Sequence, residues 1–228
     1  MFALGGNMKK LVCTFLLLAG VFGTAFADTE DKVTIIPTVG FSLPINSFKV
    51  GGDYDSSFTQ NNYNYFDASG FIIFNKTNIA LRCMLSAGVA IPDKKITDPD
   101  KKTVGNDAGF GIGAGYAVIN TKKMNLILSA ITDVAYSNYG NYETKVYSND
   151  LTLKTKNTYE MVVFEYGGSI DFVYRLSNCL GITAGVKCAG QVGQFQVKTE
   201  QTGKDDKKNQ YDMTGFTIVP RIGLSWTF

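Results

Sequence analysis

The side chains with the most scope for chemistry are acidic and basic residues that share one face of alternating segments. Glu165 and Asp171 are an even number of residues apart in such a segment, so both carboxylates lie on the same face of an extended chain. Paired carboxylates can act in general acid–base catalysis. The same faces of neighbouring segments carry basic residues, however, and ion pairing is the commoner fate of such carboxylates in a closed interior. We therefore predict an interior charge network with these members: Arg82, Asp133, Glu165, Asp171, Arg175, Lys187 and Arg221.

Other routes to catalysis are weakly supported. The chain has no histidine, so sites that place a His beside a Ser or an acid cannot form in their usual way. Glycines recur with period two in Gly109–Gly115, which is not the GxGxxG spacing of a phosphate loop, and we expect them to make room for Arg and Lys from adjacent strands. Cys83, Cys179 and Cys188 lack the spacing of a metal site. We predict no enzyme activity, no cofactor and no metal.

The first residues predict export. Two lysines precede an apolar run over residues 11–22, and Ala25 and Ala27 form a small-x-small cleavage site. This run is too short to span a membrane as a helix. We expect a cleaved signal peptide at 1–27 and a single exported domain at 28–228.

Charge and hydropathy exclude two classes of protein. The whole chain has 22 Lys and Arg against 20 Asp and Glu, and the leader holds two lysines and no acid, so the exported part is formally neutral. Without a basic surface we expect no nucleic-acid partner. No later apolar run is long enough for a membrane helix either.

The start of the chain has two candidates. Met8, directly before the leader lysines, is an alternative start to Met1.

Strict alternation of apolar and polar residues dominates the exported part. Phe110, Ile112 and Ala114, for example, alternate with glycines, and the same period recurs throughout. The pattern predicts eight strands, at 33–43, 63–74, 79–91, 108–118, 124–134, 162–174, 180–188 and 213–228.

The connections alternate between short and long. Short polar turns follow the second, fourth and sixth strands, whereas long polar segments follow the others, at Asn46–Asn62, Pro92–Asn106, Asn138–Thr158 and Lys198–Asp212. An even strand number with short turns at one end is typical of outer-membrane barrels. We therefore predict an all-β fold, an eight-stranded antiparallel up-and-down transmembrane β-barrel with short periplasmic turns and four long extracellular loops. A lipocalin-like barrel and a β-sandwich are the alternatives, but neither explains apolar faces with aromatic residues near strand ends.

The last strand alternates to its final residue. A membrane barrel must pair its last strand with its first, because no strand edge can remain open in lipid. The final stretch resembles the carboxyl-terminal assembly signal of outer-membrane barrels, through Ile222, Leu224, Trp226 and Phe228. The exported chain as a whole resembles small eight-stranded barrels of the OmpX, OmpW and OmpA kind. That resemblance implies the barrel-assembly machinery and outer-membrane lipid as partners, and location in the bacterial outer membrane.

Two functions fit such a barrel. The first is a non-enzymatic, monomeric surface protein whose loops contact host or envelope components, as an adhesin does. The second is a narrow porin-like conduit for small apolar solutes, similar to OmpW-type barrels. Bulky paired charges would close the lumen, whereas an apolar cavity would open it, and the residues expected to line that cavity are Phe71, Ile73, Met84, Ile127 and Ile131.

Overall fold

The computed structural model describes residues 33–52, 56–92, 104–146, 152–201 and 206–228. The expected signal peptide and its cleavage site at Ala25 and Ala27 lie outside this part of the chain. The described residues form these strands: β1 (Val33–Ser42), β2 (Ile45–Val50), β3 (Ser56–Phe74), β4 (Ile79–Pro92), β5 (Gly105–Asn120), β6 (Met124–Val146), β7 (Thr152–Arg175), β8 (Leu180–Gln201) and β9 (Lys207–Trp226). Within the same ranges, no helix is long and apolar enough to cross a membrane.

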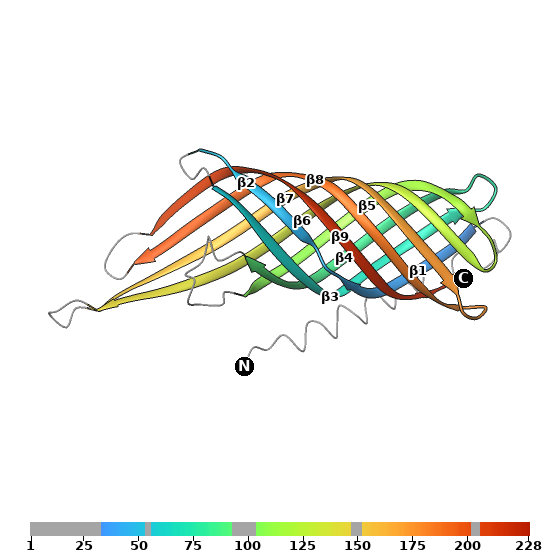
Figure 1. The fold of residues 1–228 in the computed structure, drawn as a ribbon, viewed down its shortest axis with the longest axis horizontal. Coiled ribbons are helices and arrows are strands. Elements are labelled where there is room, and N and C mark those ends of the chain that lie inside the picture. Colours follow the sequence, from blue (N-terminus) through green and yellow to red (C-terminus); the bar gives the residue numbers. More distant parts are fainter. Residues whose placement is uncertain (1–32, 53–55, 93–103, 147–151, 202–205) are drawn as a thin grey trace.

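All strands pair antiparallel in one closed ring (Figure 1). Both β1 and β2 pair with β3 on one side and β9 on the other, so they are two segments of the same barrel strand. The interruption falls at Leu43 and Pro44, next to a register shift between Gly40 and Ser42, and proline cannot donate to a ladder. The predicted eight-stranded up-and-down barrel is therefore confirmed, with its first strand split in two.

The last strand closes the barrel against the first. Leu224 lies opposite Val39 and Ile222 opposite Phe41. The pairing continues to the final residue, because the backbone groups of Phe228 and Ile35 exchange two hydrogen bonds of 3.0 Å. The first and last strands therefore pair with each other along the closing seam, as strands surrounded by lipid require.

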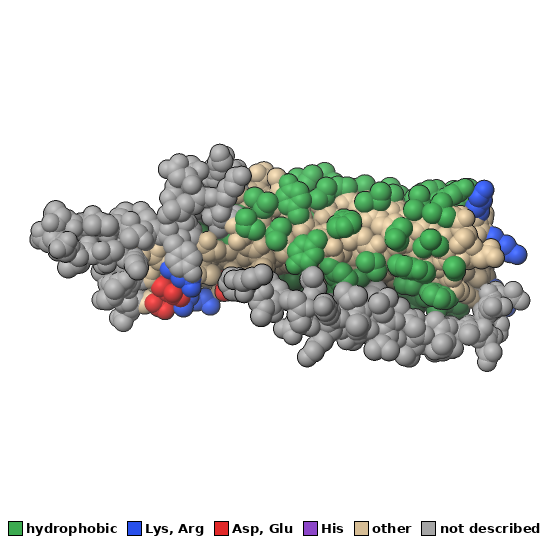
Figure 2. All heavy atoms as spheres, turned by 90° about the horizontal axis from the view of Figure 1, so that it is seen from below, with side chains coloured by type: hydrophobic (Ala, Val, Ile, Leu, Met, Phe, Trp, Pro, Cys, Tyr) green, Lys and Arg blue, Asp and Glu red, His purple; other side chains and the backbone are tan. Residues whose placement is uncertain are grey.

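The outer surface of the barrel is apolar along most of its length. Large hydrophobic side chains project outward from every strand of the ring; Ile222, for example, is 64 % exposed and Phe110 57 % exposed. On the face in Figure 2, hydrophobic side chains cover the middle of the molecule and charged groups lie toward its two ends. An apolar band between polar ends is the surface that a membrane barrel presents to lipid.

Near the long-loop end this pattern reverses. In β2, Phe48 and Val50 are buried while Ser47 and Lys49 are exposed, and in β3 Phe58 is buried while Thr59 is exposed. In this region the strands extend well into three segments that we predicted as loops, Asn46–Asn62, Asn138–Thr158 and Lys198–Asp212. In the fourth, Pro92–Asn106, residues 93–103 lie outside the described chain. Polar residues face outward here because the surface is beyond the apolar band, and the expected membrane alternation is absent.

Two apolar clusters fill opposite ends of the interior. The turn-end cluster, beside the short turns, consists of Ile36, Phe71, Ile73, Ala80, Ala117, Ile127 and Val173. The loop-end cluster consists of Phe48, Val50, Phe58, Tyr139, Tyr159, Met161, Val163, Phe195 and Met213. Neighbouring aromatic rings in this cluster contact each other, with centroids 5.3 Å apart for Phe48 and Phe58 and 5.2 Å apart for Tyr139 and Tyr159. Polar side chains occupy the space between the two clusters.

Candidate functional site

The polar layer contains two ion clusters, and the arginine cluster lies nearer the turns. Asp171 on β7 accepts from Arg82 on β4 at 3.1 Å and from the Nε of Arg221 on β9 at 2.8 Å. All three side chains are buried. Asp67 on β3 lies 3.9 Å from Arg221. The ring of Phe71, in the turn-end cluster, lies 5.5 Å and 5.8 Å from the two guanidinium carbons, a distance at which cations are attracted to aromatic faces.

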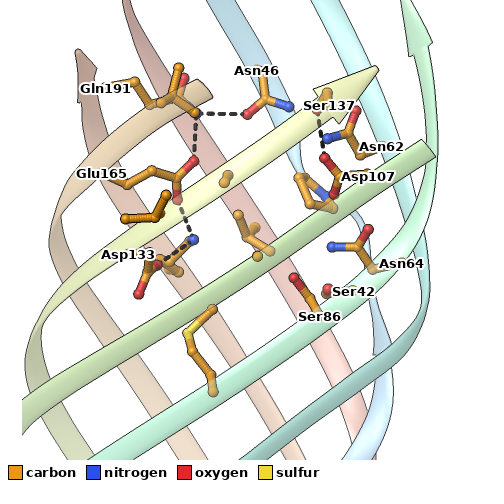
Figure 3. A pocket seen from close by; sticks show the side chains of 18 of the residues that line it. Ser42, Asn46, Asn62, Asn64, Ser86, Asp107, Asp133, Ser137, Glu165 and Gln191 are labelled. Atoms are coloured by element: carbon orange, nitrogen blue, oxygen red, sulfur yellow. Dashed lines mark hydrogen bonds and ion pairs between the residues drawn. The ribbon is translucent and has the colours of Figure 1, made fainter. Parts of the chain in front are cut away.

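The lysine cluster lies on the loop side of these arginines. Lys187 on β8 donates to Asp133 on β6 at 2.7 Å and to Glu165 on β7 at 2.5 Å. Gln191 donates to the other oxygen of Glu165 at 2.6 Å and to Asn46 at 3.1 Å. These contacts, drawn in Figure 3, link four barrel strands across the lumen. Both Glu165 and Asp171, the carboxylates with the greatest catalytic scope in the sequence, are therefore held by cations.

Glycines on inward positions make these clusters possible. A Cβ at Gly185 would stand 2.2 Å from Asp171 Oδ1, and one at Gly111 would stand 1.7 Å from Asp133 Oδ1. A Cβ at Gly113 would meet Ile131 at 2.9 Å. Within Gly109–Gly115, Gly111 thus makes room for a carboxylate and Gly113, which lies opposite Arg82, makes room for an isoleucine.

Arg175 does not join the interior network that we predicted for it. It is half-buried at the short-turn end, where it donates to Thr227 at 3.0 Å and to Asn125 at 2.9 Å. It also donates to the carbonyl oxygens of Thr121 and Lys122. Arg175 is the last residue of β7, so its long side chain reaches back over the neighbouring turn and ties turn segments together.

A central cavity of about 40 Å³ lies between the lysine cluster and the loop-end cluster. Figure 3 shows Glu165, Asp133 and Gln191 on one side of it and Asp107, Asn62 and Asn64 on the other. Asp107 on β5 is buried and accepts from Ser137 Oγ at 2.7 Å. Gln60 donates to that same hydroxyl at 3.1 Å and to Asn62 at 2.8 Å.

Sequence reasoning missed most of this cavity. Asn46, Gln60 and Asn62 fell in a segment predicted as a loop, and Asp107 lay one residue before the predicted start of its strand. The signal for Asp107 was present, because it shares the inward parity of Gly109 and the other glycines of β5.

The described residues contain no group of three or more His, Cys, Asp or Glu side chains placed to hold a metal ion. The three described cysteines are free and exposed; Cys83 and Cys188 lie on strands of the barrel wall, and Cys179 lies in the turn after β7.

Comparisons with known proteins return outer-membrane barrels. Ail of Yersinia pestis has 9 % identity with TM-score 0.39, covering 85 % of this chain and 98 % of its own. A major outer membrane protein of Thermus thermophilus has 10 % identity with TM-score 0.45, covering 83 % and 99 %. The outer membrane protease OmpT of Escherichia coli has 9 % identity with TM-score 0.35, covering 88 % and 98 %.

No protein-family model matches the chain, and no curated protein matches it. At the TM-scores above, the solved structures decide nothing about activity. The class of the molecule, an antiparallel β-barrel of the transmembrane type, rests on its closed ladder and its apolar outer band.

Proposed function

We propose that this protein is a monomeric, non-enzymatic outer-membrane barrel that presents a polar sheet to partners outside the cell. The observation that carries the proposal is the contrast between the interior and the outer strand ends. The interior is filled by two apolar clusters and a polar layer, whereas four strands continue beyond the rim of the barrel. Outer-membrane lipid and, during assembly, the barrel-assembly machinery are the further partners we expect.

The extended strand ends define the surface that would meet a partner. We call it the outer sheet: residues 140–146 of β6, 152–158 of β7, 196–201 of β8 and 207–212 of β9. The β5 ladder with β6 stops at Asn138, and the β2 ladder with β9 stops at Met213. Beyond these points the outer sheet continues alone among the described strands, and its β6–β7 hairpin reaches farthest in Figure 1. Exposed segments carried by a rigid scaffold are frequent binding elements.

A conduit for apolar solutes is less well supported. Phe71, Ile73 and Ile127 were candidates for the wall of an open apolar cavity, but they pack together in the turn-end cluster. Met84 and Ile131 are buried as well. The central cavity is lined by both polar and apolar side chains, Met84 among them, but it is far smaller than the 300–1,000 Å³ of ordinary ligand pockets.

One experiment separates the two functions. Refolded mature protein is inserted into planar lipid bilayers and tested for conductance, and the same protein in vesicles is tested for binding to immobilised extracellular-matrix proteins. A second form has residues 141–157 replaced by Asn-Gly, which suits a tight hairpin. We expect no conductance from either form, and binding only from the complete chain. Steady conductance from the complete barrel would support the conduit instead.

The assembly signal has its own test. Ile222, Leu224 and Phe228 project outward and are well exposed on the closing strand. Recognition of this strand precedes closure, so a charged tag after Phe228 should reduce the amount of barrel in the outer membrane. The amount is read from heat-modifiable protein on gels, with the same tag placed after Ala27 as the control. Equal yields from both tagged forms would mean that these residues act only as an ordinary strand.

A further inference from the structure

The buried charges of the barrel do not balance. Five buried carboxylates face three buried basic side chains among the described residues; the acids are Asp67, Asp107, Asp133, Glu165 and Asp171, and the bases are Arg82, Lys187 and Arg221. Compared with the predicted network, Asp67 and Asp107 add two carboxylates, and Arg175 lies outside the layer. A buried carboxylate without a compensating positive charge is costly, so something must neutralise this excess.

The excess lies around the central cavity. In the arginine cluster, two carboxylates face two guanidinium groups. In the lysine cluster, one ammonium faces both Asp133 and Glu165. Asp107, on the opposite side of the cavity, has hydrogen bonds from uncharged groups and no ion pair among the described residues. Both uncompensated charges therefore border the same space.

Five oxygen atoms on residues that line this cavity have no hydrogen-bond partner in the described part of the chain. They are Ser42 Oγ, Gln60 Oε1, Asn64 Oδ1, Asp133 Oδ1 and Gln191 Oε1. Each belongs to a side chain that is more than nine-tenths buried. Buried polar atoms in native proteins normally have partners, which include ordered waters and ions.

Two of the three amide oxygens among them have a fixed orientation. The Nε2 group of Gln191 donates to both Glu165 and Asn46, and the Nε2 group of Gln60 donates to both Asn62 and Ser137. Turning either amide round would place its oxygen against acceptors such as the Glu165 carboxylate. Their Oε1 atoms therefore remain as unpartnered acceptors on two residues that line the cavity.

From these observations we infer that the central cavity is a binding site for one small hard metal cation, which the free oxygens hold together with water. Oxygen donors from carboxylates, amides and hydroxyls are the ligands that such cations prefer. A cation also supplies the positive charge that the two uncompensated carboxylates lack. An anion would be repelled by Asp107 and Asp133.

The size of the site and its donors indicate a monovalent ion such as Na⁺. A volume of about 40 Å³ admits an ion with one or two waters, since one water occupies about 10–15 Å³ by this measure. The carboxylates are not clustered as a group of three, and neutral amide and hydroxyl oxygens make up most of the unpartnered donors.

The test measures how the cation affects folding equilibrium. The mature barrel is refolded in detergent, and its urea unfolding is compared in NaCl and in choline chloride of equal concentration, because choline is too large for the cavity. For a dissociation constant of about 10 mM, 100 mM Na⁺ should raise the folded-to-unfolded ratio about tenfold. KCl and LiCl series then rank the preferred ion size.

Two variants locate the effect, each with a matched control. Asp107→Asn should abolish the advantage of NaCl over choline chloride, whereas Glu200→Gln, the same charge change in the outer sheet, should retain it. Ser42→Ala removes one free oxygen without breaking a hydrogen bond to the protein, and should weaken the advantage. Ser225→Ala removes another buried, unpartnered hydroxyl that does not line the cavity, and should leave it unchanged.

Equal unfolding of the unsubstituted barrel in NaCl, KCl, LiCl and choline chloride would overturn the inference. The cavity would then hold water alone, with a proton on the carboxylate in place of a cation. The inference would also fail if Asp107→Asn and Ser42→Ala kept the full salt preference, because the ion would then bind elsewhere on the barrel.

Discussion

Ion pairs occur in two regions of this barrel, at similar distances but in different surroundings. In the arginine cluster, Arg82 lies 3.1 Å from Asp171, and the two side chains are 1 % and 0 % exposed. In the outer sheet, Lys198 lies 2.8 Å from Glu200, and those side chains are 44 % and 35 % exposed. Distance alone would rank the outer pair as the stronger one.

Burial, however, should make the pair in the arginine cluster the more sensitive of the two to mutation. An exposed pair can exchange its partner for water, so it contributes little to stability. A buried pair has given up water on both sides, and the loss of one partner leaves the other charge unsolvated. The two regions should therefore respond very differently to the same type of substitution.

The largest effect is expected at Asp171, because its removal leaves both Arg82 and Arg221 without their nearest counter-charge. Asp171→Ala should lower the free energy of unfolding by about 3–5 kcal/mol, measured by urea unfolding of the barrel in lipid vesicles. Arg221→Ala should act in the same direction and less strongly, since Arg82 still faces Asp171. Asp212→Ala, an exposed acid of the outer sheet, should stay within about 0.5 kcal/mol. Small effects from all three substitutions would mean that water reaches the arginine cluster.

A second test asks whether the lysine cluster is stabilising or only costly to break. Lys187→Met leaves Asp133 and Glu165 facing each other without a cation, and should cost about 3 kcal/mol. The triple variant Lys187→Met, Asp133→Asn, Glu165→Gln removes the charges together, and should recover most of that loss in the same unfolding measurement. A triple variant as unstable as Lys187→Met would show that the ionic contacts themselves stabilise the fold.

The membrane-facing half of the barrel could be predicted from the sequence because its chemistry repeats with a period of two. Residues such as Phe110 and Ile112 face lipid while glycines face inward, and this contrast marked all eight barrel strands. The short turns were equally clear, since Asn75–Asn78 is polar and connects two such strands.

The outer half could not be predicted in the same way, because its faces exchange polarity. Phe58 and Phe195 point into the lumen there and polar residues point out. The strand predictions depended on apolar residues at outward positions, so these segments were predicted as loops. The charge network was found in part for a related reason. The odd or even position of a residue along a strand indicates that Arg221 and Asp171 both face the interior. It does not give their positions along the barrel axis, and for this reason Arg175, which lies at the short-turn end, was wrongly included.

An intermediate effect is expected where a glycine makes room for the buried cluster. A Cβ at Gly185 would lie 2.2 Å from Asp171 Oδ1 and 2.9 Å from the carbonyl oxygen of Ile170. Gly185→Ala should therefore displace the carboxylate and cost about 1–3 kcal/mol. Gly168→Ala is the matched control, since its nearest neighbour would be the Ser129 carbonyl oxygen at 3.5 Å. If both variants unfold at the same urea concentration, the arginine cluster tolerates movement and is not tightly packed.

The smallest effect is expected in the outer sheet, where it should be visible only as a titration. The hydrogen bond from Lys198 and, next, the charge of Lys156 lower the pKa of Glu200. The ion pairs should therefore be complete above the ordinary glutamate pKa of about 4.3 and disappear as the pH falls through the lower value of the folded protein. Lys198→Ala removes the larger cause, so the Glu200 midpoint, followed by NMR of its side-chain carboxyl carbon, should move back up toward its ordinary value. Lys207→Ala should leave that midpoint in place, and the unfolding free energy should respond to neither substitution. A Glu200 midpoint that ignores Lys198→Ala would mean that the outer ion pairs do not persist in solution, and the contrast with the buried clusters would then be greater still.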